Sequence, residues 1–217
     1  MEIATPHKRV LAYGDSITWG RIACKPGRFD EDTRWTCLVQ KKFGNAVEII
    51  EEGLRCRMLE GENLYVNNCN GLKQFGAIFR SYLPLDLVLI FLGTNDMNNK
   101  ANKDPEEIAN NLIEYITIIE SQSEKPAPRK SPDILIISSP HIDESSLKRE
   151  SMFAGAGAKS HDLAQLYKAV AEKNGAYFFD AAQTVIACKE DGVHLDAEGN
   201  SSLANDLFPI IQDILLD

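Results

Sequence analysis

The stretch R-V-L-A-Y-G-D-S-I-T-W-G, residues 9–20, decides the fold of this chain. Its apolar run is typical of a buried parallel strand, and it ends abruptly at Gly14, which tolerates a tight turn into a helix. Ser16 would then lie where open α/β sheets place their ligands, beside helix N–H groups that can stabilise an anion. The turn alone has two interpretations. Either Ser16 is a nucleophile, or Asp15 or Ser16 simply caps the helix.

The composition is that of an ordinary globular protein. The chain has 217 residues, 44% of them hydrophobic and 25% charged, which predicts a single domain over residues 1–217. A net charge of −9 argues against nucleic acid as a partner. Neither a signal peptide nor a stretch long enough to span a membrane is recognisable. The five scattered cysteines favour free thiols in a reducing compartment, so we expect a cytoplasmic protein with no membrane partner.

Apolar runs alternate with helical patterns along the whole chain. Strands are predicted at residues 8–13, 46–51, 86–92, 133–138 and 176–179, and helices at residues 33–43, 70–82, 105–121, 160–174 and 197–216. This alternation predicts an α/β fold with a parallel sheet covered on both faces. The simplest topology is a flavodoxin-like three-layer α/β/α sandwich with a five-stranded parallel sheet.

Three segments exceed the usual loop length: residues 21–32, 121–132 and 140–159. The second is predicted to be a surface connector. The first and third are expected to be lids or pocket walls, because long loops at this end of a sheet often are. The third contains F-A-G-A-G-A at residues 153–158, which is predicted to be too rich in small residues for a stable helix.

A serine nucleophile needs a base, an acid that orients the base, and donors for the oxyanion. Among the four histidines, His7 lies at the wrong end of the sheet, and His141 and His161 lack an acid at an obvious spacing. His194 follows Asp191 by three residues, so that the carboxylate could hold Nδ1–H while Nε2 points at a hydroxyl. Such a spacing is by itself more often a surface turn, and only together with the serine turn does it indicate catalysis.

Two other strand ends could supply the oxyanion donors. The predicted strand at residues 86–92 is followed by Gly93-Thr94-Asn95-Asp96, which would bring Asn95 to the same sheet edge as Ser16. An asparagine amide there can donate to an oxyanion, although Asn-Asp is also good material for an Asx turn. The second predicted strand leads into Gly53-Leu54-Arg55-Cys56, whose backbone N–H groups could supply another donor.

Together these segments resemble the four blocks of the SGNH (GDSL-type) hydrolases. The blocks are Gly14-Asp15-Ser16, Gly53 with the following turn, Gly93-Thr94-Asn95-Asp96 and Asp191-x-x-His194, and they occur in the family's order. The likeness is closer to the small bacterial arylesterase/acyltransferase branch. Five segments carry it: Thr18-Trp19-Gly20, Arg34-Trp35-Thr36, Glu51-Glu52-Gly53-Leu54, Leu83-Pro84-Leu85-Asp86-Leu87-Val88 and Pro126-Ala127-Pro128.

The resemblance implies that Ser16 is the nucleophile, His194 the general base and Asp191 the acid that orients it. It also implies an oxyanion hole formed by the Ser16 N–H, the Asn95 side chain and a backbone N–H at Cys56. Cys56 replaces the family's usual glycine. A place beside an oxyanion hole could lower its thiol pKa, and whether this thiol is reactive stays open at this point. Further pocket residues implied by the resemblance are Asp15, Trp19, Gly53, Thr94 and Phe153. A homo-oligomer whose neighbouring subunits narrow the site is implied as well.

Rival motifs are incomplete. Residues 153–160, F-A-G-A-G-A-K-S, superficially resemble a phosphate-binding loop but lack glycine at both required ends and have no strand immediately before them. No G-x-G-x-x-G opens the first helix, no G-x-S-x-G elbow occurs, and no His/Cys cluster has zinc spacing. We therefore expect no cofactor and no metal.

The sequence predicts a serine esterase that hydrolyses short-chain aryl or alkyl esters through an acyl-enzyme. Acyl transfer to an alcohol would be an added activity if the acyltransferase branch is the right neighbour. One alternative is a carbohydrate O-acetylesterase, a substrate class that this superfamily also covers. An alternative of another class is a non-catalytic flavodoxin-like binding module in which Ser16 only caps a helix.

Overall fold

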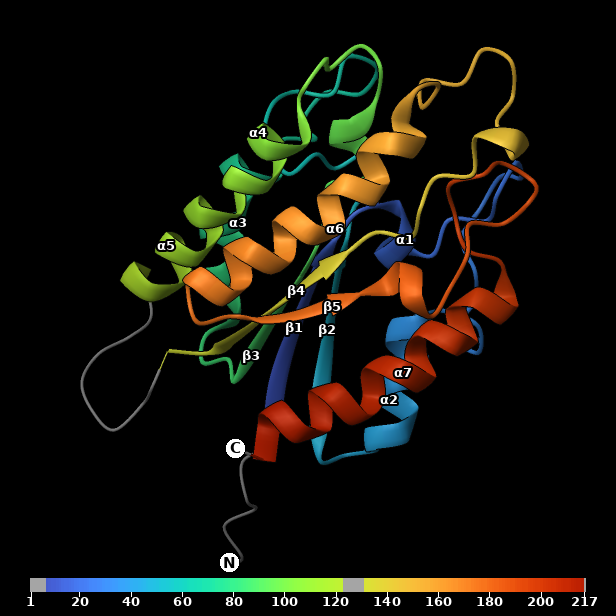
Figure 1. Cartoon of the computed structure of the whole chain (residues 1–217). Helices are drawn as coiled ribbons and strands as arrows, with labels where there is room; N and C mark the ends of the chain where they lie inside the picture. The colour runs from blue at the N-terminus through green and yellow to red at the C-terminus, as the bar shows by residue number, and fades with distance from the viewer. Residues whose placement is uncertain (1–6, 123–130, 217) are drawn as a thin grey trace, which may run out of the picture.

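The computed structural model describes residues 7–122 and 131–216. Five strands form one parallel sheet in the order β2-β1-β3-β4-β5 (Figure 1). The strands are β1 (Lys8–Gly14), β2 (Val47–Gly53), β3 (Leu87–Phe91), β4 (Asp133–Ser138) and β5 (Tyr177–Asp180). This is the flavodoxin-like order, and the predicted three-layer α/β sandwich is confirmed.

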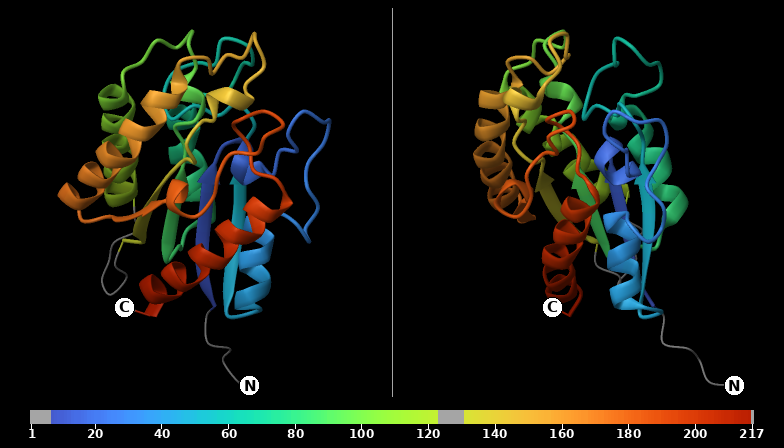
Figure 2. Two further views of the ribbon diagram at one scale, coloured as in Figure 1. Left: turned by 45° about the vertical axis from the view of Figure 1, so that its right-hand side comes forward. Right: turned by 90° about the vertical axis from the view of Figure 1, so that its right-hand side faces the viewer.

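Strand β1 is buried on both faces, which explains its unbroken apolar run. Leu11 and Tyr13 pack into one half of the core, and Val10 and Ala12 pack into the other, because successive side chains of a strand point to opposite faces. The first half is covered by α3 (Gly71–Tyr82), α4 (Pro105–Asn110), α5 (Leu112–Gln122) and α6 (Ala156–Lys173). The second half is covered by α2 (Trp35–Phe43) and α7 (Ala197–Leu216), on the opposite side of the sheet (Figures 1 and 2).

Two helices differ from the predictions. The helix predicted at residues 105–121 divides at Asn111 into α4 and α5, since Asn110 and Asn111 are weak helix formers whose side chains compete for backbone hydrogen bonds. Helix α6 begins at Ala156, within the run predicted to be non-helical. Ala156 and Gly157 in its first turn are buried, and the Gly157 N–H donates to Glu144 Oε1 at 2.8 Å, so tertiary contacts outweigh poor local propensity there. Of the predicted connector at residues 121–132, residues 123–130 lie outside the described residues.

The carboxyl ends of β1, β2 and β3 meet at one edge of the sheet, where Gly14 pairs with both Gly53 and Phe91. A Cβ atom at Gly14 would lie 2.1 Å from Thr18 Oγ1, and one at Gly53 would lie 2.3 Å from the Trp19 nitrogen. Glycine at these two strand ends therefore lets the short helix α1 (Ser16–Trp19) lie directly across the sheet edge.

Three observations concern the cysteines, membrane-spanning segments and metal-binding groups that the sequence analysis considered. All five cysteine thiols are free. Within residues 7–122 and 131–216, no helix is long and apolar enough to cross a membrane. The same described ranges contain no group of three or more His, Cys, Asp or Glu side chains that could hold a metal ion.

Candidate active site

Side chains from the two ends of the chain meet at this sheet edge. His194 Nε2 lies 2.9 Å from Ser16 Oγ, and His194 Nδ1 lies 2.7 Å from Asp191 Oδ2. Both are hydrogen-bond distances. The structure thus brings together the three residues that the sequence assigned to catalysis, in the geometry of a nucleophile, a base and an orienting acid.

The surroundings of Asp191 keep its carboxylate ionised. Asp191 Oδ1 accepts the backbone N–H groups of Val193 and His194, each at 3.0 Å. Burial opposes ionisation, but these N–H groups and the His194 ring hold the pKa of Asp191 well below its usual range. An ionised carboxylate at Nδ1–H leaves Nε2 free to accept the Ser16 proton.

Helix capping is carried by Asp15 rather than by Ser16. Asp15 Oδ1 accepts the Ile17 N–H at 2.9 Å, while the Ser16 hydroxyl contacts His194. Burial raises the pKa of Asp15, whose side chain is almost entirely inaccessible. The cap of this helix is therefore Asp15, and the Ser16 hydroxyl remains in contact with His194.

The loops after β2 and β3 bring the predicted oxyanion donors to the same edge. Asn95 begins a short 3₁₀ helix, η1 (Asn95–Met97), and its Nδ2 donates to the Arg57 carbonyl at 3.0 Å. Among the described residues, no acceptor pairs with the backbone N–H of Ser16 or of Cys56. Both N–H groups are therefore free to donate to a substrate oxygen.

Comparison with known families settles the class of protein. The family model of the GDSL-like lipases/acylhydrolases matches residues 12–201, which is most of the chain. The chain belongs to this family. It is a carboxylic ester hydrolase, and the likeness to the SGNH (GDSL-type) hydrolases inferred from the four sequence blocks is confirmed.

Solved structures agree with this assignment. An aryl esterase from M. smegmatis is 30% identical, with a TM-score of 0.89, and the match covers 95% of this chain and 99% of that one. Est24, a carbohydrate acetylesterase from Sinorhizobium meliloti, is 31% identical with a TM-score of 0.88 and the same coverage. A putative arylesterase from Agrobacterium tumefaciens is 30% identical with a TM-score of 0.86, again covering 95% and 99%. The comparison with curated proteins gave no match.

Cys56 of this GDSL-like hydrolase has a φ of +64°, in the left-handed region. Glycine adopts that region without a steric penalty, which gives a physical reason for the family's usual glycine at this position. The open question of a lowered thiol pKa is answered by the surroundings of Cys56. Burial raises the pKa of the Cys56 thiol, and the opposing charges of Arg55 and Arg21 do not offset it.

Two residues of the described site were missed in the sequence. Arg57 is almost fully buried, lies 4.1 Å from the Tyr13 ring centroid and donates to the carbonyls of Gly14 and Glu52. Its own carbonyl holds the Asn95 amide. The sequence pattern that could have predicted a buried Arg57 is its position directly before the apolar pair Met58-Leu59. No pattern marked Lys103, the second missed residue.

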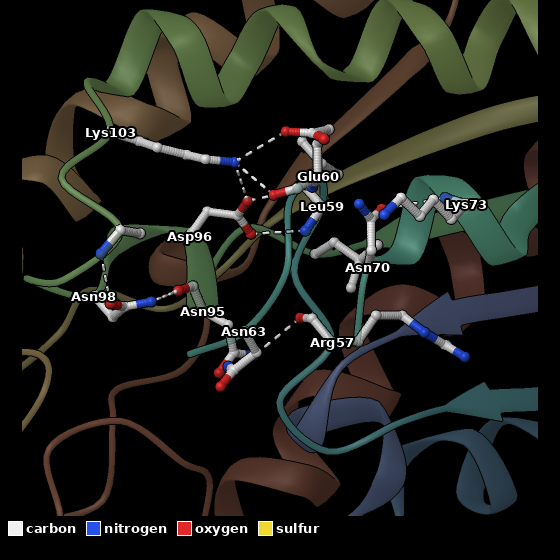
Figure 3. Close-up of polar contacts among 12 residues, drawn as sticks. Arg57, Leu59, Glu60, Asn63, Asn70, Lys73, Asn95, Asp96, Asn98 and Lys103 are labelled. Atoms are coloured by element: carbon white, nitrogen blue, oxygen red, sulfur yellow. Dashed lines mark hydrogen bonds and ion pairs between the residues drawn. The ribbon is translucent and has the colours of Figure 1, made fainter. Parts of the chain in front are cut away.

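Lys103 joins a polar cluster that ties the loop after β2 to η1 (Figure 3). Asp96 is fully buried, and its carboxylate accepts the Leu59 N–H at 2.7 Å, the Glu60 N–H at 3.3 Å and Lys103 Nζ at 3.3 Å. Burial raises the pKa of Asp96 to about 6, against the opposing effect of Lys103 and these N–H groups. The cluster fixes Asn95 next to the loop that carries Cys56.

Asp96→Ala is expected to lower the free energy of unfolding by about 3 kcal/mol, because it leaves two buried N–H groups unpaired and deprives Lys103 of its buried counter-charge. Urea denaturation would measure the loss. The double variant Asp96→Ala/Lys103→Met should regain part of it, since the buried ammonium is then gone. If Asp96→Ala were as stable as the wild type, the cluster would not stabilise the packing of the loop after β2 against η1.

A cavity of about 620 Å³ opens beside His194. Both predicted pocket walls contribute to it, the segment 21–32 through Arg21 and Cys24 and the segment 140–159 through residues 148–153. Of the five predicted pocket residues, Phe153 lines this cavity.

The other four predicted pocket residues lie elsewhere. Asp15 and Thr94 are buried, and Gly53 packs against the backbone of Trp19. Trp19 is half-buried, with the guanidinium groups of Arg28 and Arg55 near its ring. Asp15 and Thr94 therefore do not line this cavity, and their contact with substrate stays a prediction.

Asn95→Ala is expected to lower kcat for p-nitrophenyl acetate by about 10²–10³-fold, equivalent to about 2.7–4 kcal/mol of barrier, with a smaller change in KM. The reason is that the Asn95 amide would donate most strongly to the oxyanion of the transition state. Steady-state kinetics would measure the change, and thermal denaturation would verify that the variant is folded. Normal turnover in a folded variant would remove Asn95 from the oxyanion hole.

Proposed function

We propose that this ester hydrolase cleaves short-chain aryl or alkyl esters through an acyl-enzyme on Ser16. Ser16 Oγ attacks the ester carbonyl while His194 Nε2 takes its proton. The N–H groups of Ser16 and Cys56 and the Asn95 amide stabilise the tetrahedral oxyanion. The alcohol leaves with the proton from His194, and water then attacks the acyl-enzyme with His194 again as the base.

The observation that carries this proposal is the continuous hydrogen-bond chain from Ser16 Oγ through the His194 ring to Asp191, at 2.9 Å and 2.7 Å. A serine that only capped its helix would not need this chain, and here Asp15 supplies the cap. The similarity to aryl esterases favours aryl esters as substrates. Met152, Phe153 and Val193 give the cavity an apolar part that would favour an alcohol over water, so acyl transfer is the proposed side reaction.

A carbohydrate O-acetylesterase is the second candidate. It is favoured by the likeness to Est24, which is as similar to this chain as the aryl esterases are. Rates on acetylated sugars measured beside rates on simple aryl acetates would distinguish the two candidates.

Hydrolysis of p-nitrophenyl esters from acetyl to octanoyl tests the proposed function. We expect the highest kcat/KM for acetyl and a fall with increasing chain length. High activity on octanoyl would contradict a short-chain acyl site. Inactivity on all these esters and on acetylated sugars, together with no labelling of Ser16 by a fluorophosphonate, would leave the binding-module alternative.

We also propose that the enzyme is a homo-oligomer whose neighbouring subunits narrow the site. The exposed apolar side chains of Leu64, Tyr65 and Val66, in the loop that follows Cys56, support an interface near the active site. Light scattering coupled to size exclusion would test this, and a monomer at micromolar concentration would contradict it.

A further inference from the structure

The cavity beside His194 contains an excess of positive side chains, although the chain as a whole has a net charge of −9. Arg21, Lys148 and Arg149 line it, and Glu150 is the one lining acid that is not part of the proposed triad. The other lining acid, Asp191, is engaged by His194 and by two backbone N–H groups. A local positive field in an acidic protein attracts anions.

Within the described residues, none of these three cations forms an ion pair with a carboxylate. Arg21 donates to the Lys25 carbonyl, which orients its guanidinium without cancelling its charge. Lys148 and Arg149 are exposed, and in the described part of the chain neither forms an ion pair. Arg34 provides a contrast within the same molecule, because it is paired with Glu51.

A further cation, Arg55, lies near the loop that carries the proposed oxyanion donor Cys56. Arg55 lies with its guanidinium 5.5 Å from the Trp19 ring centroid, and it is exposed. Arg21 and Arg55 both act to lower the pKa of the Cys56 thiol against the stronger effect of burial, so their charges are felt at the loop that carries the proposed oxyanion donor. Arg55 therefore adds a further positive charge near the loop that carries Cys56.

The proposed mechanism indicates which part of a substrate would enter the cavity. His194 Nε2 gives its proton to the departing alcohol oxygen, so the alcohol part lies on the His194 side of the ester carbonyl. His194 lines the cavity together with Arg21, Lys148 and Arg149, so the cavity is the space that the alcohol part would reach. The carbonyl oxygen would point toward the proposed oxyanion donors at Ser16, Asn95 and Cys56.

We propose that the natural substrates are short-chain esters whose alcohol part carries a negative charge, with a carboxylate as the preferred group. This inference rests on the proposed serine esterase function and adds the charge of the substrate to it. An arginine binds a carboxylate through paired N–H donors, and a lysine binds it as a point charge, so Arg21, Lys148 and Arg149 suit such a group.

Two acetyl esters provide the test: 4-acetoxybenzoate, which is anionic, and its methyl ester, which is neutral. Each kcat/KM is divided by the rate of hydroxide-catalysed hydrolysis of the same ester, so that intrinsic reactivity cancels. We expect this corrected value to be about tenfold higher for the anionic ester at low salt. The preference should decline toward parity at about 1 M NaCl, where the screening length is roughly 3 Å.

Charge-neutralising variants locate the effect. Lys148→Gln/Arg149→Gln is expected to bring the anionic-to-neutral ratio close to one. Arg80→Gln is the control, because Arg80 is an exposed arginine on α3 that does not line the cavity, and the ratio should stay at its wild-type value. A wild-type ratio of one or less, or an unchanged ratio in the double variant, would overturn the proposal.

A binding measurement distinguishes failure of this inference from failure of the proposed function. If neither ester is hydrolysed, the esterase proposal fails as stated. Calorimetric titration of Ser16→Ala with the two esters then decides the charge preference without turnover. Tighter binding of 4-acetoxybenzoate than of its methyl ester would support the anionic site, and equal or weaker binding would overturn it.

Discussion

Replacing Ser16 with alanine is expected to lower kcat for p-nitrophenyl acetate by about 10⁶-fold, the largest effect of any single substitution in this chain. The variant lacks the oxygen that would form the acyl-enzyme, while His194 and Asp191 keep their hydrogen bond. Steady-state kinetics would measure the loss, and mass spectrometry after fluorophosphonate treatment should show the label on the wild type only.

Ser81→Ala is the matched control, because Ser81 is an exposed serine on α3 whose hydroxyl only donates to the Ala77 carbonyl. It is expected to retain wild-type turnover. Activity above about one per cent in Ser16→Ala would mean that another group is the nucleophile, because the residual rate from oxyanion donors and binding alone is far smaller.

Asp191→Asn is expected to lower kcat by about 10⁴-fold. An asparagine amide lacks the charge that stabilises the imidazolium, and it can donate to Nδ1. Donation to Nδ1 places the proton of neutral His194 on Nε2, which then cannot accept from Ser16. The exposed Asp206→Asn on α7 is the control for loss of one carboxylate and should leave kcat unchanged. Wild-type turnover in Asp191→Asn would show that His194 needs no orienting acid.

The same variant changes the pH dependence of stability. Folding lowers the pKa of Asp191, so this group adds stability above its ordinary pKa of about 3.9 and loses it as the pH falls through its lower folded value. In Asp191→Asn the stability should therefore decline less steeply on acidification. Urea denaturation between pH 6 and pH 3 would measure the difference, and identical slopes in the two proteins would contradict the lowered pKa.

Much of the fold and of the proposed site follows from the sequence, because the signals involved are local. The apolar run of β1 ends in Gly14-Asp15-Ser16, and the run of β3 ends before Gly93-Thr94-Asn95. In a parallel sheet, strand ends of this kind lie at one edge, which is why the sequence could place Ser16 and Asn95 at the same edge. The three-residue spacing from Asp191 to His194 likewise predicted a local hydrogen bond, which is present at 2.7 Å.

Other features depend on contacts between segments that are distant in the chain, and only the tertiary structure decided them. The early start of α6 reflects the contact between Gly157 and Glu144, and the Asp96–Lys103 pair depends on how the loops after β2 and β3 pack. Asp15 caps α1, while the Ser16 hydroxyl is hydrogen-bonded to His194, a residue 178 positions away in the chain.

The charge of the cavity is decided in the same way, because Arg21 and Arg149 come from loops far apart in the sequence. By itself the sequence determined the family, through the resemblance of its four blocks to the SGNH hydrolases. It also determined the order of the strands and the three residues proposed for catalysis, since periodicity and spacing report on neighbours along the chain. The tertiary structure alone decided which carbonyl holds Asn95, which acids are buried and which cations line the cavity beside His194. Those features depend on how distant loops pack against one another, and no local sequence pattern specifies that packing.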